Sequence, residues 1–168
     1  MHIVDIRPVK AGLREKYKKI RQQMPPEQKE AFDREITRRV TSLWQYKRSK
    51  WLLVYVSTPI EVDTRRLIEI ALQDGKQVAV PRCVPGTYNM EFYRIDSLGE
   101  LSPGTFGVLE PAPVPDRLVT RKEGLCIVPA LCYDFQGYRL GYGKGYYDRF
   151  LADFKGHLIG ICYSSCIQ

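Results

Sequence analysis

Apolar residues recur with helical spacing in the first quarter of the chain. Over residues 8–24 the spacings are 4, 3 and 4, which predicts one apolar stripe along a helix, formed by Leu13, Tyr17, Ile20 and Met24. Pro25-Pro26 ends this helix. A second helix follows from spacings of 4, 4 and 3 between Phe32, Ile36, Val40 and Leu43. Both stripes are expected to face a core.

From residue 51 onward, short apolar runs alternate with helical patterns. We expect strands at Trp51–Val56, Gln77–Val80, Met90–Ile95, Leu125–Val128 and His157–Cys162. Helices are expected at Thr64–Gln73 and from about Gly145 to Phe154. Strands separated by helices favour a three-layer α/β/α fold, with a mostly parallel sheet, helices on both faces and an N-terminal helical pair. The Gly- and Pro-rich residues 96–123 predict a loop that wraps the functional site.

Length and composition limit the class of protein. With 168 residues, 44% hydrophobic and 27% charged, the chain fits one domain over 1–168, in which residues 1–48 form a helical segment packed on the rest. No apolar run approaches the ~18 residues of a membrane span. The start of the chain lacks the pattern of a secretory signal, and the 5 cysteines form no C-x-x-C pair. A cytoplasmic protein with reduced thiols is therefore expected.

The positive charge lies in the first part of the chain. Residues 1–50 hold 14 Lys and Arg against 6 Asp and Glu, a net charge of +8, whereas residues 51–168 hold 12 against 13. On a helix turning ~100° per residue, Lys10, Arg14 and Arg21 fall within roughly 40° of one another, beside the apolar stripe. Such a basic stripe suits either a polyanion or one phosphate-bearing ligand; a helix face that contacts only water is the ordinary alternative.

The strongest local motif is the glycine-rich segment from Arg139 to Phe150, which runs into the last predicted helix. Glycines at alternate positions allow backbone N–H groups to converge on an anion at a helix N-terminus, and Arg139 and Lys144 add full charges. The segment is neither a Walker A loop nor G-x-G-x-x-G. We interpret it as a phosphate-binding loop, with a glycine-rich structural turn as the alternative.

Several short motifs occur in a fixed order along the chain. They are Lys10-x-x-Leu13-Arg14, Glu61-Val62-Asp63-Thr64, Val80-Pro81, Met90-x-Phe92, Gly107-x-x-Glu110-Pro111 and the glycine-rich segment up to Arg149. In this order and spacing they resemble the 5-formyltetrahydrofolate cyclo-ligase family, also called 5,10-methenyltetrahydrofolate synthetase. The resemblance covers nearly the whole chain.

The resemblance implies an ATP- and Mg²⁺-dependent ligase that closes 5-formyltetrahydrofolate to 5,10-methenyltetrahydrofolate and releases ADP and phosphate. Phosphorylation of the formyl oxygen would make that oxygen a leaving group when N10 attacks. Such a step asks the protein for positioning and charge neutralisation. It requires no Ser-His-Asp or Cys-His constellation, and none is evident in the sequence.

The family pattern assigns three groups of site residues. The ATP-binding group is Lys10, Arg14, Arg139, Gly141, Gly143, Lys144, Gly145 and Tyr146, and its four cations also carry the catalytic role. Asp148 corresponds to the magnesium ligand; capping of the helix start is its alternative. The folate-binding group is Tyr55, Glu61, Met90, Phe92, Phe106 and Tyr147. In it Glu61 accepts from the pterin donors and the others line an apolar slot; helix entry and core packing are the respective alternatives.

Two other functions are alternatives to the ligase. A non-catalytic relative could bind RNA through the basic N-terminal segment, although no aromatic-interleaved RNA motif accompanies that charge. A sugar-phosphate isomerase or acyl-transfer enzyme of similar architecture would lack this glycine-rich segment.

The family's chain normally continues beyond the strand that ends here at Cys162, so we expect a natural C-terminal tail that this sequence lacks. Tyr142 receives no role, and a monomer is expected.

Overall fold

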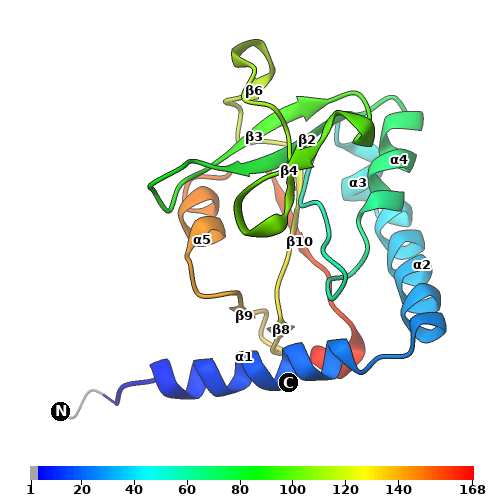
Figure 1. Cartoon of the computed structure of the whole chain (residues 1–168). Coiled ribbons are helices and arrows are strands. Elements are labelled where there is room, and N and C mark those ends of the chain that lie inside the picture. The colour runs from blue at the N-terminus through cyan, green and yellow to red at the C-terminus, as the bar shows by residue number, and fades with distance from the viewer. Residues whose placement is uncertain (1–3) are drawn as a thin grey trace.

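The computed structural model describes residues 4–168 and centres on a six-stranded sheet of order β10-β7-β1-β2-β3-β6 (Figure 1). Its strands are β1 (Trp51–Val54), β2 (Gln77–Cys83), β3 (Met90–Ile95), β6 (Leu118–Val119), β7 (Leu125–Val128) and β10 (His157–Gly160). The pairs β10·β7, β7·β1 and β1·β2 are parallel, and β2·β3 and β3·β6 are antiparallel. The prediction of a mostly parallel sheet is confirmed.

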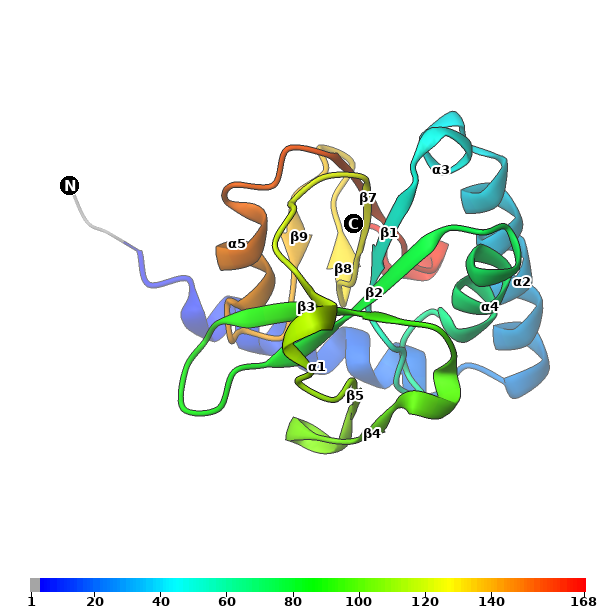
Figure 2. The ribbon, with the colours of Figure 1, turned by 90° about the horizontal axis from the view of Figure 1, so that it is seen from above.

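Helices cover both faces of this sheet, also as predicted (Figures 1 and 2). They are α1 (Arg7–Gln22), α2 (Pro26–Ser42), α3 (Trp44–Arg48), α4 (Arg65–Gln73) and α5 (Tyr146–Leu151). Alternate residues of β1 divide the core, because successive side chains of a strand point to opposite faces. Leu52 and Val54 belong to the larger cluster with α2 and α4, whereas Leu53 belongs to the smaller one with Phe150 of α5.

The first two helices do not pack as a pair. α2 covers a face of the sheet beside α4, whereas α1 runs across one end of the sheet (Figure 1). The side chains of α1 reach the segments that follow β1 and β7: Arg21 donates to the carbonyls of Ile60 and Ala130. α1 therefore lies at the carboxyl ends of parallel strands, where ligands bind in open α/β sheets.

Several local expectations needed correction. The last helix ends at Leu151 rather than Phe154, and α3 was not predicted. The residues 96–123 do not form a plain loop, because they contain β6 and the short elements η1 (Leu98–Glu100), β4 (Ser102–Pro103), η2 (Thr105–Gly107), β5 (Leu109–Glu110) and η3 (Pro115–Arg117). Two further strands pair with each other, β8 (Cys132–Tyr133) and β9 (Arg139–Leu140), and η4 (Ser164–Cys166) follows β10. None of the helices described within residues 4–168 is long and apolar enough to cross a membrane.

The turn between β1 and α4 depends on Thr64, whose side chain is fully buried. The Thr64 hydroxyl donates to the Tyr55 carbonyl at 2.6 Å and accepts from the Ser57 amide at 3.1 Å. Thr64→Val keeps the shape but leaves both backbone groups unpaired, so we expect a loss of ~1–3 kcal/mol of unfolding free energy. Urea unfolding measures the loss as a lower midpoint at unchanged slope. The control Thr120→Val, at an exposed position, should leave the midpoint nearly unchanged.

Candidate active site

The glycine-rich segment leaves the β8–β9 hairpin and enters α5, so its residues lie between a strand and a helix as predicted. Gly143 and Gly145 have φ values of 93° and 74°, the left-handed region that glycine adopts without steric cost. The sequence did not predict the hairpin itself, because each of its strands is only two residues long. The backbone turns that a phosphate-binding loop requires are present.

Helix α1 is docked directly on this loop. Nε of Arg14 donates to the Gly141 carbonyl at 2.8 Å. The Arg14 guanidinium also covers Gly143 so closely that a Cβ there would lie 3.2 Å from Cζ of Arg14. The structure thus brings together the basic stripe and the glycine-rich segment, which lie more than a hundred residues apart in sequence.

Three of the predicted phosphate-binding cations lack a carboxylate partner within residues 4–168, namely Lys10, Arg14 and Lys144. Lys10 is exposed one helical turn before Arg14, which places both side chains on the same side of α1. Lys144 is exposed in the loop. An anion placed at the loop would therefore meet positive charge that no ion pair of the described chain already neutralises.

The fourth predicted cation, Arg139, is paired. Its Nη2 donates to Oδ1 of Asp148 at 2.8 Å and its Nη1 donates to the Pro129 carbonyl at 3.0 Å. Its guanidinium also lies 5.7 Å from the ring centroid of Tyr147. The Asp148 side chain is 80% exposed, so its second oxygen faces solvent. No group of three His, Cys, Asp or Glu side chains suited to a metal occurs among the described residues.

Glu61 occupies a buried position after β1, only 8% exposed. Its Oε1 accepts from the Thr58 amide at 2.9 Å, and its own amide donates to the Thr58 carbonyl. Burial raises the pKa of the Glu61 carboxyl, while the Thr58 hydrogen bonds, the Arg21 charge and the Tyr142 hydroxyl act in the opposite direction. The second carboxylate oxygen has no protein N–H donor within the described chain.

Tyrosines surround this carboxylate. Burial raises the pKa values of Tyr55 and Tyr147 well above normal, and the charge of Glu61 contributes in both cases. Tyr55 donates to the Val62 carbonyl at 3.0 Å, whereas the buried Tyr147 hydroxyl has no partner among residues 4–168. Tyr142 also lies close enough to Glu61 for the carboxylate to raise its pKa, although burial is the larger cause. The sequence assigned Tyr142 no role, and periodicity alone could not show that the loop turns it toward Glu61.

The remaining predicted site residues divide between the loop and the core. Phe106, in the 96–123 segment, is 68% exposed, and Lys144 Nζ lies 5.9 Å from its ring centroid. Tyr146 is half-buried, with its hydroxyl 3.4 Å from the Thr87 carbonyl. Phe92 is only 1% exposed and stacks on Phe150 at 4.6 Å, which is the geometry of core packing. Met90 is half-buried beside that same cluster.

The tip around Phe106 is fixed by its own backbone and by Glu110. Phe106 has a φ of 59°, which is uncommon outside glycine. The buried Glu110 carboxylate accepts from the Cys83 amide at 3.3 Å and packs against Gly104, where a Cβ would collide with it. The 96–123 segment reaches the glycine-rich loop where Phe106 lies beside Lys144.

Comparison with known proteins adds to this geometry. Residues 6–162 match a model described as the 5-formyltetrahydrofolate cyclo-ligase family. A Mus musculus 5-formyltetrahydrofolate cyclo-ligase is 30% identical over 90% of this chain and 77% of its own length. A Schizosaccharomyces pombe protein, named as a probable 5-formyltetrahydrofolate cyclo-ligase, is 34% identical over 71% of this chain, and the match spans 60% of that protein.

Solved structures agree with these matches. The Aquifex aeolicus 5,10-methenyltetrahydrofolate synthetase superposes with a TM-score of 0.82 at 31% identity, covering 95% of this chain and 80% of that chain. The Mycoplasma pneumoniae 5,10-methenyltetrahydrofolate synthetase has a TM-score of 0.70 at 21% identity, covering 95% of this chain and 88% of that chain. The second likeness supports the three-layer α/β fold alone.

Proposed function

The chain belongs to the 5-formyltetrahydrofolate cyclo-ligase family, a family of ligases, and from this membership we propose that it uses ATP and Mg²⁺ to close 5-formyltetrahydrofolate to 5,10-methenyltetrahydrofolate. ADP and phosphate are the other products. The observation that carries the proposal is the docking of Arg14 on Gly141 and Gly143, which joins a basic helix to the glycine-rich loop at the end of the sheet that also holds Glu61.

The proposed chemistry is phosphoryl transfer followed by ring closure. The oxygen of the N5-formyl group attacks the γ-phosphorus of ATP, and ADP leaves. N10 then attacks the formyl carbon, its proton is lost, and the phosphate departs with the former formyl oxygen, leaving the N5–C–N10 cation. In such a reaction the protein contributes alignment of the reacting atoms and stabilisation of charge.

The phosphate half of the site would be formed by α1 and the loop. Lys10, Arg14 and Lys144 would neutralise the triphosphate, because no carboxylate of the described chain pairs with them. The backbone N–H groups around Gly143 and Gly145 would add hydrogen bonds, as in other anion-binding turns. Tyr146 would contact the nucleotide from the first turn of α5, and Arg139 would hold that turn through Asp148.

The folate half would be formed around Glu61. A carboxylate accepts well from the paired N–H donors of a pterin ring, and one Glu61 oxygen is not engaged by a backbone amide of the described chain. The unpartnered Tyr147 hydroxyl supports this location, because a buried polar group without a partner is costly unless a ligand or water satisfies it. Phe106, Tyr55 and Met90 would line the rings of the substrate. Phe92 would support them from the core.

The residues present are compatible with magnesium bound mainly by phosphate oxygens. Mg²⁺ usually takes one or two carboxylates and completes its shell with substrate phosphates and water. Asp148 offers one exposed carboxylate beside the loop. When bound, the ion would neutralise charge that develops on the transferred phosphoryl group. The protein's own contribution is the orientation of Asp148 by Arg139 at 2.8 Å.

The cysteines bear on the compartment in which the protein works. The 5 cysteines of the chain are all free thiols. Such a set of thiols agrees with a reducing compartment, so we propose a cytoplasmic location. A monomeric state stays a prediction.

Gly143→Ala is expected to weaken ATP binding by roughly tenfold while the fold is retained. The added Cβ would press on the Arg14 guanidinium at 3.2 Å, and alanine is strained at a φ of 93°. Gly137→Ala is the matched control, because Gly137 has a φ of 89° and open space around its Cβ position. Calorimetric titration with ATP should show the loss only for Gly143→Ala; equal affinities in both variants would contradict the role of the Arg14–Gly143 contact.

The overall reaction can be followed by the absorbance of 5,10-methenyltetrahydrofolate. We expect the absorbance to rise when 5-formyltetrahydrofolate, ATP and Mg²⁺ are all present and to stay flat when any one is omitted. A rise without ATP would rule out the ligase mechanism. No rise under any condition would rule out the proposed activity for this chain.

A further inference from the structure

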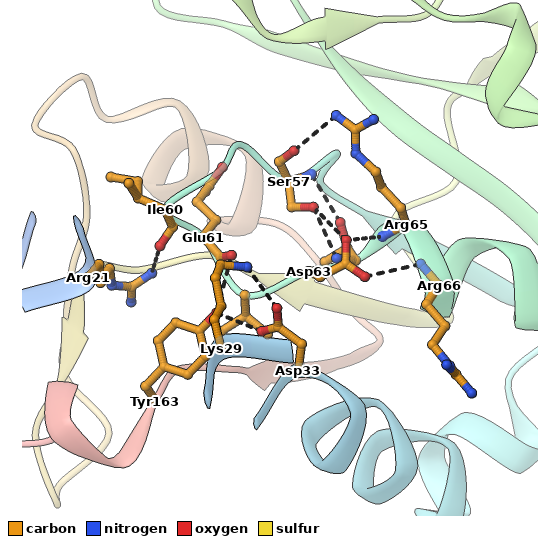
Figure 3. A network of polar contacts seen from close by, with 12 residues as sticks. Arg21, Lys29, Asp33, Ser57, Ile60, Glu61, Asp63, Arg65, Arg66 and Tyr163 are labelled. Atoms are coloured by element: carbon orange, nitrogen blue, oxygen red, sulfur yellow. Dashed lines mark hydrogen bonds and ion pairs between the residues drawn. The ribbon is translucent and has the colours of Figure 1, made fainter. Parts of the chain in front are cut away.

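Three successive carbonyl groups in the segment after β1 are contacted by buried side chains from different parts of the chain. The Ile60 carbonyl accepts from Nη1 of Arg21 at 3.3 Å, and the Glu61 carbonyl lies 3.4 Å from the Tyr163 hydroxyl (Figure 3). The Val62 carbonyl accepts from Tyr55 at 3.0 Å. The Tyr163 hydroxyl donates its hydrogen to Oδ1 of Asp33 at 2.6 Å, so Arg21 and Tyr55 are the donors that fix the backbone on the two sides of Glu61.

Arg21 differs from the two tyrosines because it joins three elements. It projects from α1, reaches the Ile60 carbonyl after β1, and donates through Nη2 to the carbonyls of Ala130 at 2.6 Å and Leu131 at 2.9 Å, after β7. The side chain is only 4% exposed and lies 5.6 Å from the Tyr163 ring centroid. The helix with the proposed phosphate-binding cations is thereby tied to the segment that carries Glu61.

Arg21 is also a buried charge without a carboxylate within salt-bridge distance among residues 4–168. Its Nε has no hydrogen-bond partner in the described part of the chain. Burial of an unpaired guanidinium is costly, and an apolar residue of similar volume would fill the same space without that cost. The Arg21 charge acts to lower the pKa of the Glu61 carboxyl, as the Thr58 hydrogen bonds do, against the larger effect of burial. A role for the charge itself, beyond packing, would explain its presence.

We propose that Arg21 is a positioning residue for folate, which fixes the Glu61 loop to α1 and places a buried positive charge beside that loop. The inference rests on the proposed role of Glu61 as acceptor for the pterin donors. It adds a residue that does not touch substrate but positions one that does and favours its ionised form.

The groups that face Glu61 come from every element packed around it. They are Arg21 from α1, Thr58 and Tyr55 from the segment after β1, Tyr142 from the glycine-rich loop, Tyr147 from α5, and Tyr163 from the segment after β10, which faces the Glu61 backbone. The Arg21 guanidinium is the cation of this set. Removing it should raise the pKa of Glu61, so the ionised carboxylate would be lost at a higher pH as the solution is acidified.

The test is the affinity for 5-formyltetrahydrofolate as a function of pH, measured by calorimetry without ATP. Folate affinity should fall as the solution is acidified and Glu61 is protonated, and we call this part of the profile the acid limb. For Arg21→Met we expect the acid limb to shift to higher pH by about one pH unit. Folate affinity near neutral pH should fall roughly tenfold. Arg21→Lys keeps the charge but cannot reach all three carbonyls. It should lose folate affinity about tenfold without the same shift of the limb. ATP affinity should change by less than about twofold in both variants.

Tyr163→Phe is the comparison variant. It removes the hydroxyl that donates to Asp33 at 2.6 Å and lies 3.4 Å from the Glu61 carbonyl, but it leaves the ring beside Arg21 and the Arg21 charge itself. A purely structural account predicts that Tyr163→Phe and Arg21→Met both lower the melting temperature and that neither moves the acid limb. An unmoved limb in Arg21→Met would overturn the proposal. If Arg21→Met does not fold, equal losses of folate and ATP affinity in Arg21→Lys would overturn it. If wild type does not bind 5-formyltetrahydrofolate at any pH, the proposed function itself fails, a result distinct from both.

Discussion

Glu61→Gln is expected to raise the KM for 5-formyltetrahydrofolate roughly ten- to hundredfold, or to abolish turnover, because one acceptor oxygen becomes a donor that faces the pterin donors. The substitution keeps the shape of a side chain that is only 8% exposed, so the fold should survive. ATP affinity should stay within about twofold of wild type. Steady-state kinetics with each substrate varied in turn measures both effects.

The pH dependence gives the same prediction a second readout. Burial raises the pKa of the Glu61 carboxyl, so folate binding should weaken as the pH falls through that raised value and the carboxylate is protonated. Glu61→Gln cannot titrate and should lack this acid limb. Glu69→Gln, on the exposed side of α4, is the control and should behave as wild type. If Glu61→Gln turned over folate normally, or lost ATP affinity instead, Glu61 would have only the helix-entry role.

Arg14→Ala is expected to weaken ATP binding roughly ten- to hundredfold, because it removes a full charge together with the hydrogen bond that docks α1 on the loop. The affinity for 5-formyltetrahydrofolate should change much less, because Arg14 contacts Gly141 and Gly143 rather than the Glu61 segment. Calorimetry with ATP and with folate, each alone, separates the two effects.

Lys19→Ala is the control for Arg14→Ala. Lys19 lies on the same helix, is exposed, and has no ion pair within the described chain, so it changes the net charge by the same amount at a position away from the loop. ATP affinity within about twofold of wild type is expected for this variant. An equal loss in Lys19→Ala and Arg14→Ala would show that the general charge of α1, and not the site, attracts the nucleotide.

The sequence predicted the elements that carry long periodic patterns. The stripe through Leu13 and Tyr17 correctly places α1, and the apolar runs at Trp51 and Leu125 correctly place adjacent parallel strands. The same helical spacing placed Lys10, Arg14 and Arg21 together beside the apolar stripe, and the structure separates them: Lys10 is exposed, whereas Arg21, one turn after the buried Tyr17, lies in the core. Charge alone does not show whether a cation faces water or a row of backbone carbonyls.

Other features depend on tertiary contacts that no local pattern contains. The β8–β9 hairpin is too short to leave an alternating pattern, yet it sets where the glycine-rich loop begins. The motif Met90-x-Phe92 suggests that Phe92 contacts the rings of the substrate. In the structure Phe150 of α5 packs on Phe92, which lies in the core. The loop that carries Tyr142 is fixed by the Arg14–Gly141 hydrogen bond on one side and by the β8–β9 pairing on the other. These residues become interpretable once the elements are assembled.

The fate of the formyl oxygen distinguishes phosphoryl transfer to that oxygen from other routes to the product. Unlabelled ATP, Mg²⁺ and 5-formyltetrahydrofolate carrying ¹⁸O in the formyl group are incubated with the enzyme, and the released inorganic phosphate is examined by mass spectrometry. We expect one ¹⁸O atom in each phosphate formed, in step with 5,10-methenyltetrahydrofolate, because the phosphate departs with the oxygen it activated. Unlabelled phosphate accompanying product would contradict phosphoryl transfer to the formyl oxygen.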